Sequence, residues 1–124
     1  MTDSALILLV DDYDEGRELT ADFLISAGYE VVAVADAAAA LEAAGHSPHG
    51  FRLLITDVNL RGMSGLELAQ AVHQISPELP VLYVSGEAVP PSIPPDDVLL
   101  KPFEFAVFSA KVRELIARSE GGAT

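Results

Sequence analysis

The chain has 124 residues, a length that predicts one domain. Seven Lys and Arg residues against nineteen Asp and Glu residues give a formal net charge of −12, which argues against binding to nucleic acid or to an anionic membrane surface. The sequence contains no Cys, which excludes a disulfide framework, a thiolate nucleophile and a Cys-based zinc site.

The first predicted strand is Ala5–Val10, a continuous apolar run that ends at Asp11 and Asp12. Such a run is typical of a strand buried on both faces of a parallel sheet. Asp14 is predicted to cap the following helix, and Gly28 is predicted to follow its end with a positive φ. Apolar residues recur along this helix at helical spacing, namely Leu19, Phe23, Leu24 and Ala27.

The second predicted strand covers Glu30–Ala35, and a helix over Ala37–Ala44 follows it. Asp36 is the predicted N-cap of this helix, and Gly45 is predicted to end it. In the polar turn that comes next, the stretch His46–His49 has a spacing seen in metal sites, but no third ligand accompanies it.

The third predicted strand begins at Phe51 and ends at Asp57. A loop then leads to Ser64, which forms a capping box with Glu67 at the start of the next helix. The inner face of this helix is predicted to carry Leu66, Ala69, Val72 and Ile75.

The fourth predicted strand is Val81–Val84, which closes at Ser85. Four prolines lie between residues 87 and 97 and oppose a helix there, so we expect a loop or a single turn. The last strand is Val98–Leu100, followed by Lys101. A terminal helix then turns four residues inward, namely Phe108, Val112, Leu115 and Ile116.

Five strands that alternate with four or five helices predict an α/β fold: a three-layer sandwich in which a five-stranded parallel sheet carries helices on both faces. In such sheets, sites form outside the carboxyl ends of the strands. Three carboxylates, a hydroxyl and an ammonium are therefore expected to meet at one edge of the sheet. They belong to Asp11, Asp12, Asp57, Ser85 and Lys101.

Carboxylates gathered at one edge need a cation, because two of them ~4 Å apart repel by about 4 kcal/mol even at an effective dielectric constant of about 20. Oxygen ligands that leave room for water and phosphate suit Mg²⁺. One carboxylate would then remain as a nucleophile, while Lys101 and Ser85 contact the other phosphoryl oxygens. The pattern predicts phosphoryl transfer onto an aspartate.

From Ile7 to about Ile116, the sequence resembles the receiver domains of two-component response regulators. The motifs that carry the resemblance are Val10-Asp11-Asp12, Thr56-Asp57, Gly62-Met63-Ser64-Gly65 with Glu67, Pro80-Val81 leading to Ser85-Gly86, and Leu100-Lys101-Pro102-Phe103. The resemblance implies a flavodoxin-like sheet with the strand order 2-1-3-4-5.

The resemblance also implies that Asp57 accepts a phosphoryl group from a histidine kinase, a histidine phosphotransfer protein or a small donor such as acetyl phosphate. Mg²⁺, or Mn²⁺ in its place, would be held by the carboxylates of Asp11, Asp12 and Asp57 and by the main-chain carbonyl of Asn59. The implied family member is a signalling switch that catalyses its own phosphorylation and dephosphorylation.

Further residues acquire roles by the same resemblance. Lys101 would pair with the phosphoryl group, Ser85 would turn toward it, and the peptide bond before Pro102 is expected to be cis. Asn59 and Glu87 stand where the family tunes the access of water to the phosphoryl group. Both side chains can hydrogen-bond water, which predicts a labile phosphoaspartate.

The sequence departs from the family pattern at three places. Val98 stands where the family usually has an aromatic residue that reports phosphorylation, and Arg61 stands where proline is common. The segment between Ser85 and Lys101 is several residues shorter than usual and rich in proline, so the fourth helix of the family is expected to be reduced or missing.

We expect a single receiver domain over residues 1–124, with a core of about residues 5–118 and flexible ends. Its start does not resemble a signal peptide and no apolar run approaches the ~18 residues that span a bilayer, so we expect a cytoplasmic protein. A receiver domain nearly fills the sequence, which predicts that the signal leaves by contact with a downstream protein.

Two alternatives remain open. Asp12-Tyr13-Asp14 has the D-x-D spacing of haloacid-dehalogenase-like phosphatases, although Gly16 stands where that family wants Thr or Val. The other alternative is a pseudo-receiver that docks to partners without being phosphorylated. Because all five expected site positions are filled, the sequence favours a phosphorylated receiver.

Overall fold

A computed structural model describes residues 5–47, 50–87 and 89–122. Its strands are β1 (Leu6–Val10), β2 (Glu30–Val34), β3 (Phe51–Asp57), β4 (Val81–Ser85) and β5 (Val98–Leu100). Its helices are α1 (Asp14–Ser26), α2 (Ala37–His46), α3 (Gly65–Ile75) and α4 (Phe105–Gly122), with a short 3₁₀ helix η1 (Pro95–Asp97). Of the ends predicted to be flexible, residues 1–4 and 123–124 lie outside the described residues, whereas α4 continues past the predicted core boundary at about residue 118 to Gly122. The predicted histidine spacing at His49 also lies outside the described residues.

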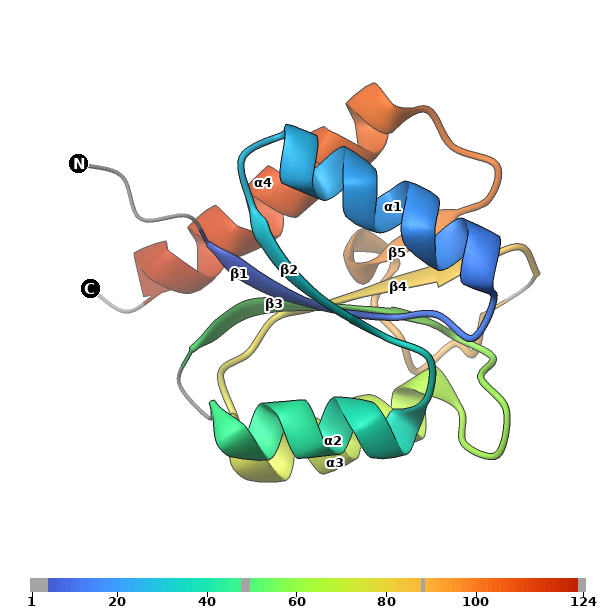
Figure 1. Ribbon diagram of the computed structural model, residues 1–124, viewed down its shortest axis with the longest axis vertical. Coiled ribbons are helices and arrows are strands. Elements are labelled where there is room, and N and C mark those ends of the chain that lie inside the picture. The colour runs from blue at the N-terminus through green and yellow to red at the C-terminus, as the bar shows by residue number, and fades with distance from the viewer. Residues whose placement is uncertain (1–4, 48–49, 88, 123–124) are drawn as a thin grey trace.

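The strands form one parallel sheet in the order β2-β1-β3-β4-β5, which confirms the expected topology. Helices α1 and α4 cover one face of the sheet, and α2 and α3 cover the other (Figure 1). The predicted three-layer α/β sandwich is therefore confirmed. Within the described residues, none of the helices has both the length and the apolar character needed to cross a membrane.

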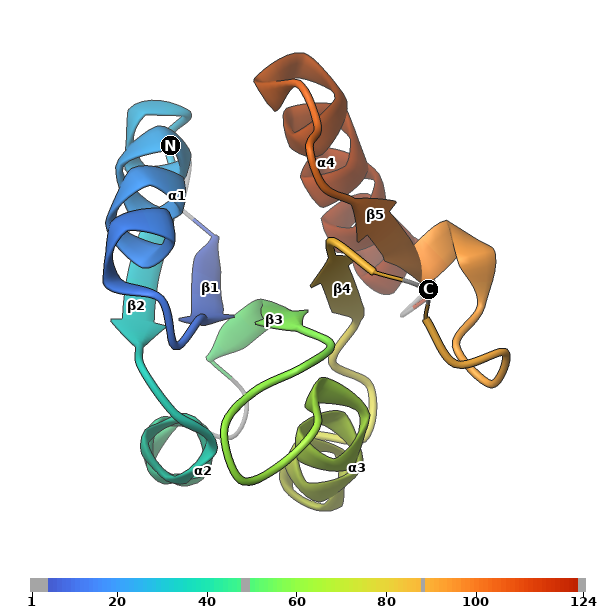
Figure 2. The ribbon, with the colours of Figure 1, turned by 90° about the vertical axis from the view of Figure 1, so that its right-hand side faces the viewer.

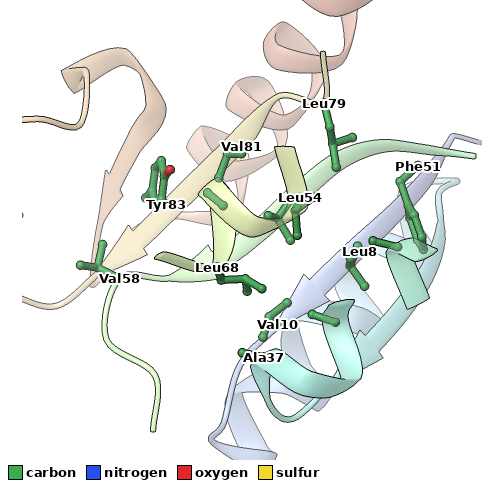
Figure 3. Close-up of a cluster of buried hydrophobic side chains, with 14 of the residues drawn as sticks. Leu8, Val10, Ala37, Phe51, Leu54, Val58, Leu68, Leu79, Val81 and Tyr83 are labelled. Atoms are coloured by element: carbon green, nitrogen blue, oxygen red, sulfur yellow. The ribbon is translucent and has the colours of Figure 1, made fainter. Parts of the chain in front are cut away.

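The sheet buries both of its faces because successive side chains of a strand point in opposite directions. In β1, Ile7 and Leu9 belong to the core that α4 covers, whereas Leu8 and Val10 belong to the core that α2 and α3 cover. Figure 3 shows the second of these cores, in which Leu8 and Val10 lie near Leu54 of β3. This alternation explains why the sequence of β1 is apolar at every position.

Local signals define most helix ends as predicted. The Asp36 side chain accepts a hydrogen bond from the Ala39 amide at 2.8 Å, and Ser64 and Glu67 form both bonds of the capping box. Gly28 follows α1 with a φ of 103°. Gly45 does not end α2 as predicted, because the helix continues to His46 and a glycine near a helix end costs only about 1 kcal/mol relative to alanine.

Two predictions for α1 are wrong. Tyr13 holds the N-cap position, so Asp14 is the first helical residue and pairs with Arg17 at 2.7 Å instead of capping the helix. Leu19 was predicted to face the core but is 59% exposed, because it borders an open cavity at the end of the sheet. Ala27, also predicted to face inward, is exposed at the C-cap.

The segment between β4 and β5 contains only the short helix η1 in its described part, as the prolines predicted. It lies beside β5 at the edge of the sheet (Figure 2). Ile93 is buried and Val89 is half-buried, and both pack on the core that contains Tyr83. The fourth helix of the family is thus reduced to the short helix η1 in the described part of this segment, as expected. Apolar side chains of the segment cover this edge of the core in its place.

Candidate functional site

Three carboxylates meet at the carboxyl ends of two neighbouring strands. Asp11 and Asp12 follow β1, and Asp57 ends β3. One carboxylate oxygen from each residue lies within 4.8 Å of the others. Asp11 is only 7% exposed, and the Asp57 side chain is 16% exposed. The structure thus brings together the three acidic residues that the sequence placed at one edge.

Lys101 supplies a positive charge to this cluster, with its Nζ 3.0 Å from Oδ1 of Asp57. The backbone holds it there, since the Lys101 amide donates to the Ser85 carbonyl at 2.7 Å. The peptide bond between Lys101 and Pro102 is cis. Lys101 and Asp57 come from distant parts of the sequence and meet because β3, β4 and β5 are neighbours in the sheet.

The surroundings of Asp57 disfavour the ionised form of its carboxyl group. Burial and the nearby Asp11 carboxylate raise the pKa of Asp57 to about 6, although Lys101 acts in the opposite direction. A divalent cation among the carboxylates would relieve both effects. Because the cluster offers only oxygen ligands, its chemistry fits a hard cation such as Mg²⁺.

The start of α3 packs directly on the end of β3, and Gly65 makes this possible. A Cβ atom at Gly65 would overlap the carbonyl oxygen of Asp57. The Gly65 amide also donates to the Val58 carbonyl at 2.7 Å. The close approach of the two backbones therefore requires glycine at this position.

Two residues that follow Asp11 in the chain hold it in place by hydrogen bonds. Oδ1 of Asp11 accepts from the Tyr13 amide at 2.9 Å, and the carbonyl oxygen of Asp11 accepts from the Arg17 guanidinium at 3.0 Å. Arg17, which the sequence did not single out, also holds Asp14. The Asp14 side chain is 81% exposed and is not part of the carboxylate cluster, which argues against a D-x-D phosphatase site.

Asp12 contacts a residue that the sequence marked only as a departure from the family. Its Oδ2 accepts from the Arg61 amide at 3.2 Å and lies 3.7 Å from Nε of the same residue. This contact joins the loop after β1 to the loop after β3. Nothing in the local sequence around either residue indicates it.

Ser85 is buried beside the cluster, but its hydroxyl bonds to the neighbouring backbone. It donates to the Glu87 carbonyl at 2.9 Å and accepts from the Glu87 amide at 3.0 Å. The Glu87 side chain accepts from the Asn59 amide group at 3.5 Å, so the two residues expected to influence water access touch each other. Val98 of β5 pairs with Tyr83 of β4, and β4 lies between Val98 and the strand that carries Asp57.

Two open cavities flank Asp57 and Lys101. One of about 500 Å³ is lined by polar residues of the surrounding loops, among them Asn59, Ser85 and Glu87. The other, of about 340 Å³, is mostly apolar and is bordered by α1 and by the start of α4. Its apolar lining includes Leu19, Phe103, Phe105 and Phe108. The Asp57–Lys101 pair is therefore accessible from a polar side and from an apolar side.

Comparisons with known proteins agree with this geometry. The sequence profile of the response regulator receiver domain matches residues 7–113. The chain is 33% identical over 116 residues to the response regulator receiver protein CpdR of Brucella abortus, with coverage of 89% of this chain and 95% of CpdR. It is 36% identical over 121 residues to the response regulator protein FleR of Pseudomonas aeruginosa, covering 93% of this chain but only 24% of FleR.

A response regulator receiver protein from Sinorhizobium medicae has a similar solved structure. The TM-score is 0.84 at 27% identity, and the match covers 94% of this chain and 98% of that one. The similarity thus extends over nearly the whole sheet with its helices.

Proposed function

The chain belongs to the response regulator receiver domain family of two-component signalling, and from this membership we propose that Asp57 is its phosphoacceptor. The observation that carries the proposal is the position of the Asp57 carboxylate, 3.0 Å from the Lys101 ammonium within a cluster of three carboxylates. We propose further that residues 1–124 act as one receiver unit.

In the proposed reaction, a carboxylate oxygen of Asp57 attacks the phosphorus of a phosphohistidine, and the bond between phosphorus and the imidazole nitrogen breaks. Lys101 offsets the negative charge of the transferred oxygens. Asp11, Asp12 and Asp57, with the Asn59 carbonyl, would hold Mg²⁺, or Mn²⁺ in its place. Bound Mg²⁺ supplies further positive charge to the phosphoryl oxygens.

In the proposed switch, the negative charge that phosphorylation adds at Asp57 causes the conformational change. The phosphoryl group replaces the single charge of Asp57 by roughly −1.5 to −2. Ser85 would leave its two bonds to the Glu87 backbone and donate to a phosphoryl oxygen, which moves the loop after β4. Asn59 and Glu87 would then admit water to the phosphoryl group, so that the switch returns by its own hydrolysis.

The proposed donor is a histidine kinase or a histidine phosphotransfer protein, and a downstream protein receives the signal. Exposed Leu19 and Phe105 support a protein donor, because they line the apolar cavity next to Asp57. Apolar side chains of this kind offer a contact surface close to the reacting carboxylate.

The experiment that tests the proposal is labelling with acetyl phosphate in Mg²⁺, followed by intact-mass and peptide mass spectrometry. We expect one phosphoryl group on Asp57 and no label in Asp57→Asn. Asp12→Asn should be labelled more slowly, but still on Asp57.

Loss of the label only in Asp12→Asn, together with steady phosphate release from unrelated esters, would instead establish the phosphatase alternative. A folded chain that neither binds Mg²⁺ nor takes up phosphate would establish the pseudo-receiver.

A further inference from the structure

Arg61 directs two donors at the same carboxylate oxygen. Its backbone amide lies 3.2 Å from Oδ2 of Asp12, and its Nε lies 3.7 Å from that atom. The Asp12 side chain is only 23% exposed, whereas the Arg61 side chain is 88% exposed. An exposed positive group of the chain itself thus contacts one of the three carboxylates that would hold a metal ion.

A metal ion bound to either oxygen of the Asp12 carboxylate would lie near this guanidinium, and the two positive charges would repel each other. Mg²⁺ binds its ligands at about 2.0–2.1 Å and prefers a nearly octahedral shell that includes waters. An ion bound to Asp12 would therefore lie close to the positive charge of Arg61. Because the guanidinium is exposed, water and salt weaken the repulsion without abolishing it.

A second position for the Arg61 guanidinium, away from Asp12, lies in a neighbouring cavity. An open cavity of about 610 Å³ lies beside Asp12 and is lined by Tyr13, Asp14, Glu15, Ala35, Asp36 and Arg61. Three of these residues are acidic and lie outside the carboxylate cluster. Next to Arg61, Gly62 has a φ of 81°, a conformation that few other residues adopt. A displaced guanidinium would find there the Glu15 carboxylate and the second carboxylate oxygens of Asp14, which already pairs with Arg17, and of Asp36, which caps α2.

We propose that Arg61 is a built-in counter-ion of Asp12, which neutralises this carboxylate in the metal-free protein and withdraws when a divalent cation binds. Arg61 then sets the affinity of the site for Mg²⁺: the ion has to displace a resident positive charge. The inference rests on the proposed function in that the site is the metal site of the phosphoacceptor.

The test measures Mg²⁺ binding to the complete chain by isothermal titration calorimetry after treatment with a chelator. Arg61→Gln removes the charge and Arg61→Lys keeps it. Arg113→Gln is the matched control, because Arg113 is an exposed arginine on α4 and its loss changes the net charge equally. We expect Arg61→Gln to bind Mg²⁺ roughly 3- to 10-fold more tightly than the parent, and the difference to shrink as KCl is added.

Arg61→Lys and Arg113→Gln should both stay within about twofold of the parent, because each leaves a positive charge beside Asp12. As a second measurement, the Nε–H resonance of Arg61 should shift when Mg²⁺ is added to the parent. This readout reports a change around the Arg61 side chain and does not depend on phosphorylation.

Unchanged affinity in Arg61→Gln would overturn the inference, as would equal tightening in Arg113→Gln. Weaker binding in Arg61→Gln would overturn it too, since Arg61 would then position Asp12 for the metal. If neither the parent nor Arg61→Gln binds Mg²⁺, the inference falls together with the proposed metal site. If Mg²⁺ binds as expected but Asp57 takes up no phosphate, only the proposed function fails.

Discussion

At the scale of one residue, the surroundings of Asp57 determine how readily its carboxyl group is ionised. Burial and Asp11 disfavour its charge more strongly than Lys101 favours it, so that its pKa is raised to about 6. Gly65 lets α3 start directly against the Asp57 carbonyl oxygen, where a Cβ atom would overlap it. The metal-free site is therefore under electrostatic strain at neutral pH.

This strain predicts a pH dependence of stability. With a pKa of about 6 in the folded state and 3.8 as the reference, the folded protein binds more protons between these values, so Asp57 makes stability fall as the pH rises through this range. Without metal, Asp57→Asn should be more stable than the parent by about 1–2 kcal/mol at pH 7.5, after discounting for solvent. At pH 4 the gain should be nearly absent.

Urea unfolding with a chelator at both pH values measures this difference. Asp22→Asn, at an exposed position of α1, controls for the change in net charge. An Asp57→Asn variant that is no more stable than the parent at pH 7.5 would show that the Lys101 ion pair outweighs burial.

At the scale of elements, the segment between β4 and β5 has only the short helix η1 in its described part, and a few side-chain contacts attach it to the rest of the fold. Ile93 fills the core beneath the segment, and Asp97 at the end of η1 lies 3.7 Å from Arg118 of α4. Burial, more than any neighbour, raises the pKa of Asp97, and burial followed by Asp97 raises that of Tyr83. The proline-rich segment is thus anchored to the sheet and to the last helix.

The anchoring predicts that Ile93→Ala destabilises the protein by about 2–3 kcal/mol, because it removes a buried side chain and leaves a cavity. The neighbouring Ser92 is exposed, so Ser92→Ala should change the free energy of unfolding by less than about 0.5 kcal/mol. Chemical denaturation of the two variants compares them directly. Equal, small effects would mean that the segment covers the sheet without supporting it.

At the scale of the whole molecule, the sheet assembles a cation site from distant parts of the sequence, so metal binding and folding should be coupled. At ten times its Kd, Mg²⁺ should raise the free energy of unfolding by about 1.4 kcal/mol. Thermal unfolding across a Mg²⁺ titration tests this, with Asp12→Asn as the variant that should lose the gain. An unchanged melting temperature in the folded parent would contradict a preformed site.

The sequence predicted the sheet well because buried parallel strands are continuous apolar runs, and the strand ends then located Asp11, Asp12, Asp57 and Lys101 together. It could not show that Leu19 borders a cavity, because helical periodicity does not say how closely neighbouring elements pack. It also predicted the N-cap of α1 at Asp14, one residue too late, because Tyr13 holds that position without the side-chain hydrogen bond that marks a cap in a sequence.

The contact between Arg61 and Asp12 was hidden for a further reason. It depends on the paths of two loops that are far apart in the sequence, and no local pattern records such a path. The hydrogen bonds of Ser85 to Glu87 depend likewise on the backbone of one turn. The sequence thus predicted which side chains lie at the strand ends, but it did not predict their hydrogen-bond partners.

The order of the strands also has a consequence for the newly made chain. A ribosome releases Asp11, Asp12 and Asp57 well before Lys101, and β1 and β3 are direct neighbours in the sheet. The segments that carry the three carboxylates are therefore complete before the segment that carries Lys101. Until Lys101 follows, dissolved cations and Arg61 can meet these carboxylates and Lys101 cannot, so the order of synthesis exposes the carboxylates to metal ions before it exposes them to the lysine.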